Sequence, residues 1–301
     1  MSPKLDSLEK NFRSSPLTQL NNPCFDRQGI ELWIKRDDLL HPIISGNKWR
    51  KLKYSLAHAL SLDMNTLISM GGIYSNHLHA LAYAGKLLGL QTVGIIRGEP
   101  LSVLTPTLRD AQHWGMVLKF VSRTEYRALR QYKTFDSFPD LKPQQYWLPE
   151  GGAHTLALQG VAELVDEINM AYNTLCVPCG TGATLAGIAS AVNDNIAVLG
   201  FSALKNADFL YADVATLLLQ PRNNWQINQA YHFGGYAKTN ASLLAFIEDF
   251  ELQTKIPLEA VYTGKMLYGL YELIQQGYFK PDQRIIAVHT GGLQGKRQNR
   301  P

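Results

Sequence analysis

The stretch Val177-Pro178-Cys179-Gly180-Thr181-Gly182-Ala183-Thr184-Leu185-Ala186-Gly187 leads from an apolar, strand-like run through two glycines into a helical pattern. Glycines allow successive backbone N–H groups to converge, and the start of a helix adds partial positive charge. The hydroxyls of Thr181 and Thr184 can donate further hydrogen bonds. The stretch therefore predicts a loop that binds a phosphate group between a strand and a helix.

Apolar runs alternate with helical periodicities on both sides of this loop. The predicted strands cover residues 32–35, 66–70, 92–96, 145–148, 174–177, 197–202 and 284–289. The predicted helices cover residues 49–59, 77–88, 105–114, 157–170, 183–192, 241–253 and 264–276. Such alternation predicts an α/β fold with a mostly parallel sheet that is covered by helices on both faces.

Two other kinds of phosphate loop do not match the glycine segment. A nicotinamide-binding Rossmann unit needs an acidic residue at the end of the next strand, but that strand ends Phe201-Ser202-Ala203-Leu204-Lys205. A P-loop needs a lysine directly before a serine or threonine, which the segment lacks. The sequence thus favours a phosphate-bearing cofactor that is smaller than a dinucleotide.

Lys48 is the candidate nucleophile, in the run Ser45-Gly46-Asn47-Lys48-Trp49-Arg50-Lys51-Leu52. Crowding by Arg50 and Lys51 and partial desolvation both disfavour a protonated amine, so we expect the pKa of Lys48 to be lowered. A lysine of this kind can form a Schiff base with an aldehyde cofactor. Taken alone, the run is also compatible with a solvated basic face of a helix.

Composition excludes several other classes of protein. The chain has 301 residues, of which 46% are hydrophobic and 18% charged, with a net charge of +4 and a pI of about 8.8. It lacks the long basic stripe of a nucleic-acid-binding protein, and no apolar run approaches the roughly 20 residues that span a bilayer. The polar start Met1-Ser2-Pro3-Lys4-Leu5-Asp6 predicts a cytoplasmic protein.

The three cysteines predict neither a disulfide framework nor a metal site. Cys176 and Cys179 have the C-x-x-C spacing, but a zinc site would need a second pair of ligands. Cys176 ends an apolar run and Cys179 precedes the glycines. We therefore expect one cysteine at the end of a strand and the other in the wall of the loop, without a metal.

Together, the lysine and the glycine loop make the chain resemble the tryptophan-synthase-β-like (fold type II) pyridoxal-phosphate enzymes. Within these it is similar to the group of D-cysteine desulfhydrase and 1-aminocyclopropane-1-carboxylate deaminase. The resemblance runs from Ile34 to Gly292. Its motifs, in the order of the family, are G-N-K-x-R-K-L at 46–52, G-G-I-x-S-N-H at 71–77, the glycine loop at 180–184, V-Y-T-G-K at 261–265 and H-T-G-G at 289–292.

The resemblance implies pyridoxal 5'-phosphate as the cofactor and a role for each matching residue. Lys48 would form the Schiff base and later take the Cα proton of the substrate. Asn76 would donate a hydrogen bond to the phenolic oxygen of the cofactor. The phosphate would be held by Gly180, Thr181, Gly182, Ala183 and Thr184.

It also implies a binding site for a small amino-acid substrate. Ser75 would meet the substrate carboxylate, with Asn76 and His77 beside it. Tyr262 and Tyr236 would face the substrate side chain as an acid or an orienting hydroxyl. The alternatives are that the Ser75-Asn76 pair simply caps a helix and that Tyr262 is a core aromatic.

Thr263 departs from the cyclopropane-cleaving members of the group, which carry a glutamate there to pair with the pyridine nitrogen. Thr263 and Thr290 can offer that nitrogen only neutral hydroxyls. A neutral ring suits elimination of a leaving group better than ring opening. We therefore expect elimination from D-cysteine or a similar β-substituted amino acid. The alternatives are 1-aminocyclopropane-1-carboxylate deamination and a catalytically silent relative that keeps the cofactor.

The fold that the resemblance implies has two domains, each an open, mostly parallel twisted sheet flanked by helices. Residues 1–50 and 157–301 would form a large cofactor-binding domain, and residues 51–156 a small domain inserted into it. The cofactor would lie in the cleft between them. The resemblance also implies a homodimer.

Overall fold

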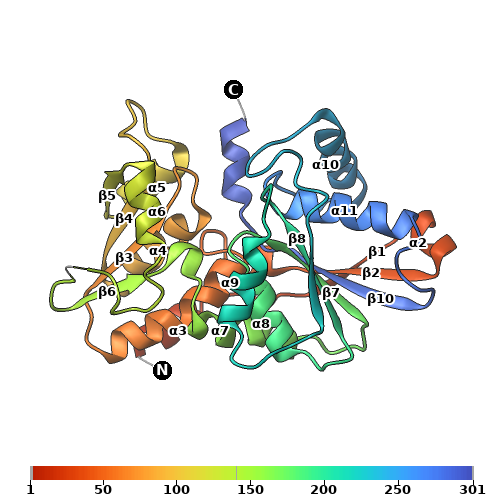
Figure 1. Ribbon diagram of the computed structural model, residues 1–301, viewed down its shortest axis with the longest axis horizontal. Coiled ribbons are helices and arrows are strands. Elements are labelled where there is room, and N and C mark those ends of the chain that lie inside the picture. Colours follow the sequence, from red (N-terminus) through yellow and green to blue (C-terminus); the bar gives the residue numbers. More distant parts are fainter. Residues whose placement is uncertain (1–2, 140, 300–301) are drawn as a thin grey trace.

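The computed structural model describes residues 3–139 and 141–299, which form two β-sheets with helices packed on their faces (Figure 1). The strands are β1 (Leu17–Leu20), β2 (Ile30–Lys35), β3 (Thr66–Gly71), β4 (Gln91–Arg97), β5 (Met116–Val121), β6 (Gln145–Leu148), β7 (Thr174–Cys179), β8 (Ala197–Ser202), β9 (Trp225–Asn228) and β10 (Gln283–Val288). The α-helices are α1 (Pro3–Glu9), α2 (Pro23–Gln28), α3 (Asn47–Ser61), α4 (Asn76–Leu88), α5 (Pro106–His113), α6 (Arg123–Leu129), α7 (Thr155–Asp166), α8 (Ala183–Ala191), α9 (Phe209–Leu217), α10 (Ala241–Thr254) and α11 (Thr263–Gln275). Short 3-10 helices lie at Asp37–Leu39, Glu150–Gly152 and Leu293–Asn299.

The larger sheet has six strands in the order β1-β2-β10-β7-β8-β9, and all neighbours are parallel except β1 and β2. Its central strand β7 is buried throughout, and its side chains alternate between two cores. Cys176 packs in the core beneath α10 and α11, whereas Leu175 and Val177 pack in the core beneath α7 and α8. The sheet is therefore covered on both faces, as the apolar runs predict.

The smaller sheet has four parallel strands in the order β5-β4-β3-β6. Leu67 of β3 faces a core that includes α3 and α4, and the neighbouring Ile68 faces a second core that includes Tyr126 of α6. Leu5 and Leu8 of α1 also pack in the first of these cores. The predicted α/β fold class, with mostly parallel sheets flanked by helices, is confirmed, while the exact bounds of the two domains stay a prediction.

Helix α3 connects the two sheets, and a buried group of charges fixes its first turn. The Arg50 guanidinium donates to Asp37 at 3.1 and 3.2 Å and to Glu167, which follows α7, at 2.7 Å. Lys35, at the end of β2, donates to the same Glu167 at 2.6 Å. Because these partners belong to the large sheet and its helices, the start of α3 is held at the end of that sheet.

The strands missed by the sequence analysis all lie at sheet edges. They are β1, β5 and β9, of which β1 and β9 have four residues each. An edge strand is exposed along one side and needs no continuous apolar run, so its pattern is weak. Predicted elements elsewhere differ from the observed ones by a few residues at their ends. Within the described residues, no helix combines the length and apolar character needed to cross a bilayer.

Candidate active site

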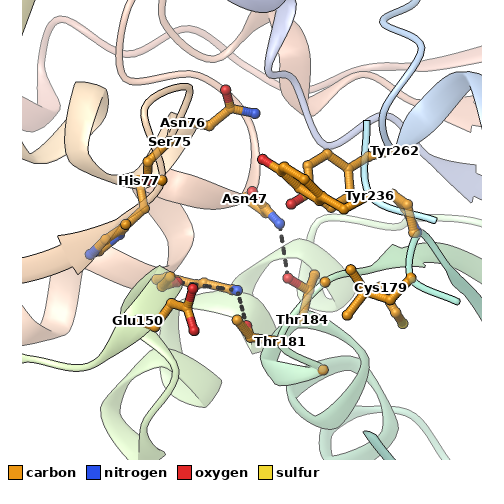
Figure 2. A pocket seen from close by; sticks show the side chains of 18 of the residues that line it. Asn47, Ser75, Asn76, His77, Glu150, Cys179, Thr181, Thr184, Tyr236 and Tyr262 are labelled. Carbon is orange, nitrogen blue, oxygen red and sulfur yellow. Dashed lines mark hydrogen bonds between the residues drawn. The ribbon is translucent and has the colours of Figure 1, made fainter. Parts of the chain in front are cut away.

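A cavity of about 560 Å³ opens at the ends of strands from both sheets. Its wall includes Gly71 and Arg97 at the ends of β3 and β4, Cys179 at the end of β7, and Thr290 just after β10. Parallel strands direct their carboxyl ends to one edge of a sheet, which is where α/β proteins bind ligands. The cavity is therefore the candidate site, and Figure 2 shows side chains that line it.

The glycine loop forms one wall of the cavity, between β7 and α8. Gly182 has a φ of 76°, and a Cβ placed on it would stand 2.5 Å from a side-chain carbon of Val214. Both the backbone conformation and the close packing thus require glycine there. No side chain caps the start of α8, so its first N–H groups remain to bind an anion.

Two α3 residues that were not predicted to bind the phosphate also reach this loop. Asn47 donates to the Thr184 hydroxyl at 3.0 Å (Figure 2). The Lys51 ammonium lies 3.4 Å from both the Thr181 hydroxyl and the Gly151 carbonyl oxygen. Burial and the charge of Lys48 hold the pKa of Lys51 well below its ordinary value. Lys51 lies three residues after Lys48 on the same helix, and residues with this spacing share one face. That spacing could have predicted that Lys51 also faces the cofactor site.

Lys48 is the second residue of α3 and lies on the cavity wall. Burial lowers the pKa of its amine from 10.5 to about 8, although the Glu259 carboxylate acts in the opposite direction. The lowered pKa is thus as predicted, but one part of the reason was wrong. Arg50 does not line the cavity, and its charge is matched by Asp37 and Glu167.

The segment from Ser75 to His77 lies across the cavity from the glycine loop (Figure 2). Ser75 caps α4 by accepting a hydrogen bond from the Leu78 N–H at 3.2 Å, so the capping alternative holds while the residue also lines the cavity. Asn76 accepts from the side-chain amide of Gln294. The His77 Nε2 meets the Ser69 hydroxyl at 2.9 Å, and burial followed by the charges of Lys48 and Lys51 keeps its pKa well below the usual value.

Tyr262 and Tyr236 approach each other edge to face, with ring centroids 6.0 Å apart. Burial raises the pKa of both hydroxyls, so they stay protonated and able to donate. Tyr236 lies in a loop whose carbonyl oxygens at His232 and Gly235 accept from the Lys265 ammonium at 2.8 and 2.7 Å. The backbone around Tyr262 is held by Glu259, which accepts from three successive N–H groups at the start of α11.

Thr263 is buried behind the cavity wall, whereas Thr290 lies on the wall. The hydroxyl of Thr263 is fully buried and stands 3.4 Å from that of Thr290, which lines the cavity. Among the described residues, Glu150 is the one carboxylate on the wall, and it accepts from Tyr126 and pairs with Arg130. The Glu259 carboxylate neighbours Thr263, but it does not line the cavity and already accepts from three backbone N–H groups. On the wall itself, the threonine pair therefore offers a hydroxyl and not a carboxylate.

The structure brings nearly all of the predicted residues to one cavity. Those on its wall are Lys48, Ser75, Asn76, His77, Gly180, Thr181, Gly182, Thr184, Tyr236, Tyr262 and Thr290. Ala183 begins α8 and, like Thr263, is buried behind the wall. The individual roles of these residues remain predictions.

The cysteines differ in part from the expectation, because Cys176 lies in the middle of β7 and Cys179 is the residue that ends the strand. Cys176 and Cys179 both belong to β7, and Cys179 lines the cavity. Burial raises the pKa of the Cys179 thiol to about 12, so it stays uncharged. All three cysteines are free thiols.

The sequence pattern of one family, described as pyridoxal-phosphate dependent enzyme, matches residues 8–291. The chain belongs to this family. The cavity fits the cofactor of a pyridoxal-phosphate-dependent enzyme: the uncapped start of α8 and the buried Lys51 ammonium suit a phosphate, and Lys48 provides an amine of lowered pKa for the aldehyde.

Several named proteins are similar to this pyridoxal-phosphate-dependent enzyme over most of its length. A putative 1-aminocyclopropane-1-carboxylate deaminase of Pyrococcus horikoshii is 28% identical, and the match covers 98% of this chain and 96% of the relative. The bifunctional D-cysteine desulfhydrase/1-aminocyclopropane-1-carboxylate deaminase of Arabidopsis thaliana is 30% identical over 93% of this chain and 77% of its own. The D-cysteine desulfhydrase of Yersinia pestis is 28% identical, and the match covers 96% of this chain and 94% of the relative.

Solved structures agree with this assignment. The crystal structure of an ACC deaminase homologue has a TM-score of 0.75 at 28% identity, and the match covers 98% of this chain and 97% of that one. Threonine deaminase isoform 2 of Solanum lycopersicum has a TM-score of 0.67 at 15% identity over 96% of this chain and 87% of its own. The second likeness shows a shared fold alone.

We expect Lys51→Met to weaken pyridoxal phosphate binding by about 10- to 100-fold. The negative phosphate favours the protonated form of the Lys51 amine, and a charge-assisted hydrogen bond contributes roughly 1.5–3 kcal/mol. The apoenzyme would be titrated with the cofactor and free ligand measured by equilibrium dialysis. Lys86→Met, at an exposed site on α4, is the matched control. An unchanged affinity in Lys51→Met would show that Lys51 does not bind the phosphate.

Proposed function

We propose that the enzyme catalyses α,β-elimination of a small β-substituted amino acid, D-cysteine or one similar to it. From D-cysteine and water the products are pyruvate, ammonia and sulfide. The observation that carries this proposal is the hydroxyl pair of Thr263 and Thr290, beside which the Glu259 carboxylate is turned to backbone N–H groups and does not line the cavity. The similarity to the D-cysteine desulfhydrase of Yersinia pestis supports the same reaction.

The bound cofactor would supply an aldehyde that bonds to the amino group of the substrate and withdraws electrons from Cα. Lys48, whose pKa is about 8, would then remove the Cα proton. As the Cβ–S bond breaks, its electron pair would leave with the sulfur, and the protonated hydroxyl of Tyr262 would provide a proton. Ser75 and neighbouring N–H groups would hold the substrate carboxylate, and addition of water to the product releases ammonia.

A panel of three substrates tests the reaction. We expect a 2-oxo acid and ammonia from D-cysteine and β-chloro-D-alanine, and slower or no turnover of 1-aminocyclopropane-1-carboxylate, since a neutral cofactor ring is a weaker electron sink. The readout is a coupled assay of the 2-oxo acid at saturating cofactor. Turnover of the cyclopropane amino acid alone would establish the alternative activity, which the name of the Pyrococcus relative favours. A protein that binds the cofactor and releases no product would be the silent relative.

The assembly and location remain part of the proposal. The family resemblance supports a homodimer, which sedimentation equilibrium would test directly. We propose a cytoplasmic location, whereas the Arabidopsis relative is named as mitochondrial. Fractionation of cells that express the tagged protein would decide between the two compartments.

A further inference from the structure

Four arginines line the part of the cavity that the smaller sheet and α6 contribute. Arg97 ends β4, Arg123 and Arg127 lie on α6, and Arg130 follows directly after it. The α6 arginines are spaced by four and three residues, which places them on one face of the helix. Because Arg123, Arg127 and Arg130 all line the cavity, this face of α6 is directed toward the site.

The four arginines outnumber the carboxylates on the cavity wall. Glu150 is the one carboxylate on the cavity wall among the described residues, and Arg130 pairs with it at 2.9 Å. Glu150 also accepts from the Tyr126 hydroxyl at 2.6 Å, so its single negative charge is already shared by two donors. In the described part of the chain, Arg97, Arg123 and Arg127 form no ion pair, although the Arg97 guanidinium lies 5.7 Å from the Tyr126 ring centre.

Arg97 lies close to the reacting end of the cavity. One of its guanidinium nitrogens is 4.0 Å from the place that a Cβ on Gly72 would take, in the loop that leads to Ser75. The positive charge of Arg97 also acts on the Tyr236 hydroxyl. It lowers the pKa of that hydroxyl, against the larger effect of burial, which raises it. Arg97 thus lies near the loop expected to hold the substrate carboxylate, and its charge also acts on a tyrosine expected to face the substrate side chain.

The expected ligands leave three positive charges unmatched. The cofactor phosphate would be matched by Lys51 and the start of α8, and the substrate carboxylate by the Ser75 segment. Arg97, Arg123 and Arg127 are solvent-exposed, and together they give this side of the cavity a positive potential that favours a further anion. Guanidinium groups bind carboxylate, sulfonate and phosphate oxygens in a forked geometry, which a neutral thiol cannot satisfy.

We propose that the preferred substrates carry a second anionic group on the side chain, and that Arg97, Arg123 and Arg127 bind it. This inference rests on the proposed function and narrows its substrate class to β-substituted amino acids whose substituent is an oxyanion. With such a substituent the Cα–H and Cβ–X bonds break, and X leaves with the bonding electron pair. D-Cysteine would then be accepted as a smaller, neutral analogue.

Binding of a matched pair of amino acids tests the anion site without turnover. Aspartate and asparagine have the same shape and differ in charge, and neither has a leaving group for β-elimination. We expect the holoenzyme to bind aspartate of the accepted handedness about 10- to 100-fold more tightly than asparagine, as measured by isothermal titration calorimetry with both enantiomers. In Arg97→Gln and in the double variant Arg123→Gln/Arg127→Gln, this ratio should fall toward one.

Arg109→Gln, at an exposed position on α5 outside the cavity, is the matched control and should keep the ratio. A wild-type ratio near or below one would overturn the inference. So would an equal loss of both affinities in Arg97→Gln, because the arginine would then bind the α-carboxylate that the two ligands share. A ratio that falls with added salt in the wild type would support an electrostatic origin.

Turnover then separates this inference from the proposed function. Cysteate and O-phosphoserine carry sulfonate and phosphate groups, and O-acetylserine and β-chloroalanine are the neutral comparisons. Release of pyruvate with at least about tenfold higher kcat/KM for an anionic member would support the inference, and would identify the oxyanion. If the neutral compounds are preferred, the arginine inference fails while elimination stands. If aspartate binds selectively but no compound yields pyruvate, elimination fails while the anion site stands.

Discussion

Replacing Lys48 with alanine is expected to lower kcat/KM for the elimination by about 10³-fold or more. The variant loses the amine that would bond to the cofactor and the base that would take the Cα proton, and general-base catalysis alone contributes roughly 10²- to 10⁴-fold. The same variant should lack the near-ultraviolet to visible absorption band of a protein-bound Schiff base. Both effects would be measured on purified protein after incubation with excess cofactor.

Borohydride reduction of the wild type should fix the cofactor on the peptide that contains Lys48, and Lys86→Met should behave as the wild type does. The rate of cofactor attachment should rise with pH up to about 8 and then level off, because only the neutral amine attacks and the Lys48 pKa is about 8. An unaltered absorption band in Lys48→Ala would show that another lysine forms the Schiff base with the cofactor. A rate that keeps rising to pH 10 would mean that the amine is not desolvated.

Replacing Arg50 with alanine is expected to lower the free energy of unfolding by about 3–5 kcal/mol, the usual cost of removing one partner from a buried ion pair. The side chains of Arg50 and Asp37 are 3% and 0% exposed, so the Asp37 carboxylate would remain buried without its partner. Lys35 and Glu167 belong to the same group of charges. Urea unfolding of the apoenzyme, followed by circular dichroism, would measure the loss.

Arg284→Ala is the matched control, because Arg284 also holds a glutamate with two hydrogen bonds but in a pair whose side chains are 31% and 45% exposed. Its removal should cost no more than about 1 kcal/mol. Equal losses in the two variants would show that burial does not set the cost. Replacement of Arg50 and Asp37 together by Met and Leu should recover part of the loss, since no charge is then left unpaired.

The sequence predicted the central part of the fold better than its borders. The bounds of β6 and β8 agree with the predicted strands 145–148 and 197–202, and the helices that carry the site lie within a few residues of their predicted ranges. Buried parallel strands give continuous apolar runs, which a sequence displays directly. The edge strands β1, β5 and β9 and the helices α1, α2, α6 and α9 were not predicted, because their patterns are short or only partly apolar.

The site was predicted where its residues stand in short motifs. Lys48, the Ser75 segment, the glycine loop and Tyr262 each occur in such a motif, and all reach the cavity. Residues outside the motifs were missed, among them Arg97, Arg127 and Glu150. No local pattern marks them, because they approach the site only through the packing of α6 and the ends of β4 and β6.

The amino-acid sequence by itself determined the strand and helix periodicities and the glycine loop, because backbone freedom and side-chain polarity are local properties. Only the tertiary structure decided the electrostatics of the site. The amine of Lys48 has a lowered pKa because the surrounding protein removes water from it, while Arg50, two residues away, keeps its charge because Asp37 and Glu167 surround it. Two neighbouring basic residues thus acquire opposite properties, since the solvation of a charge depends on which parts of the chain fold around it.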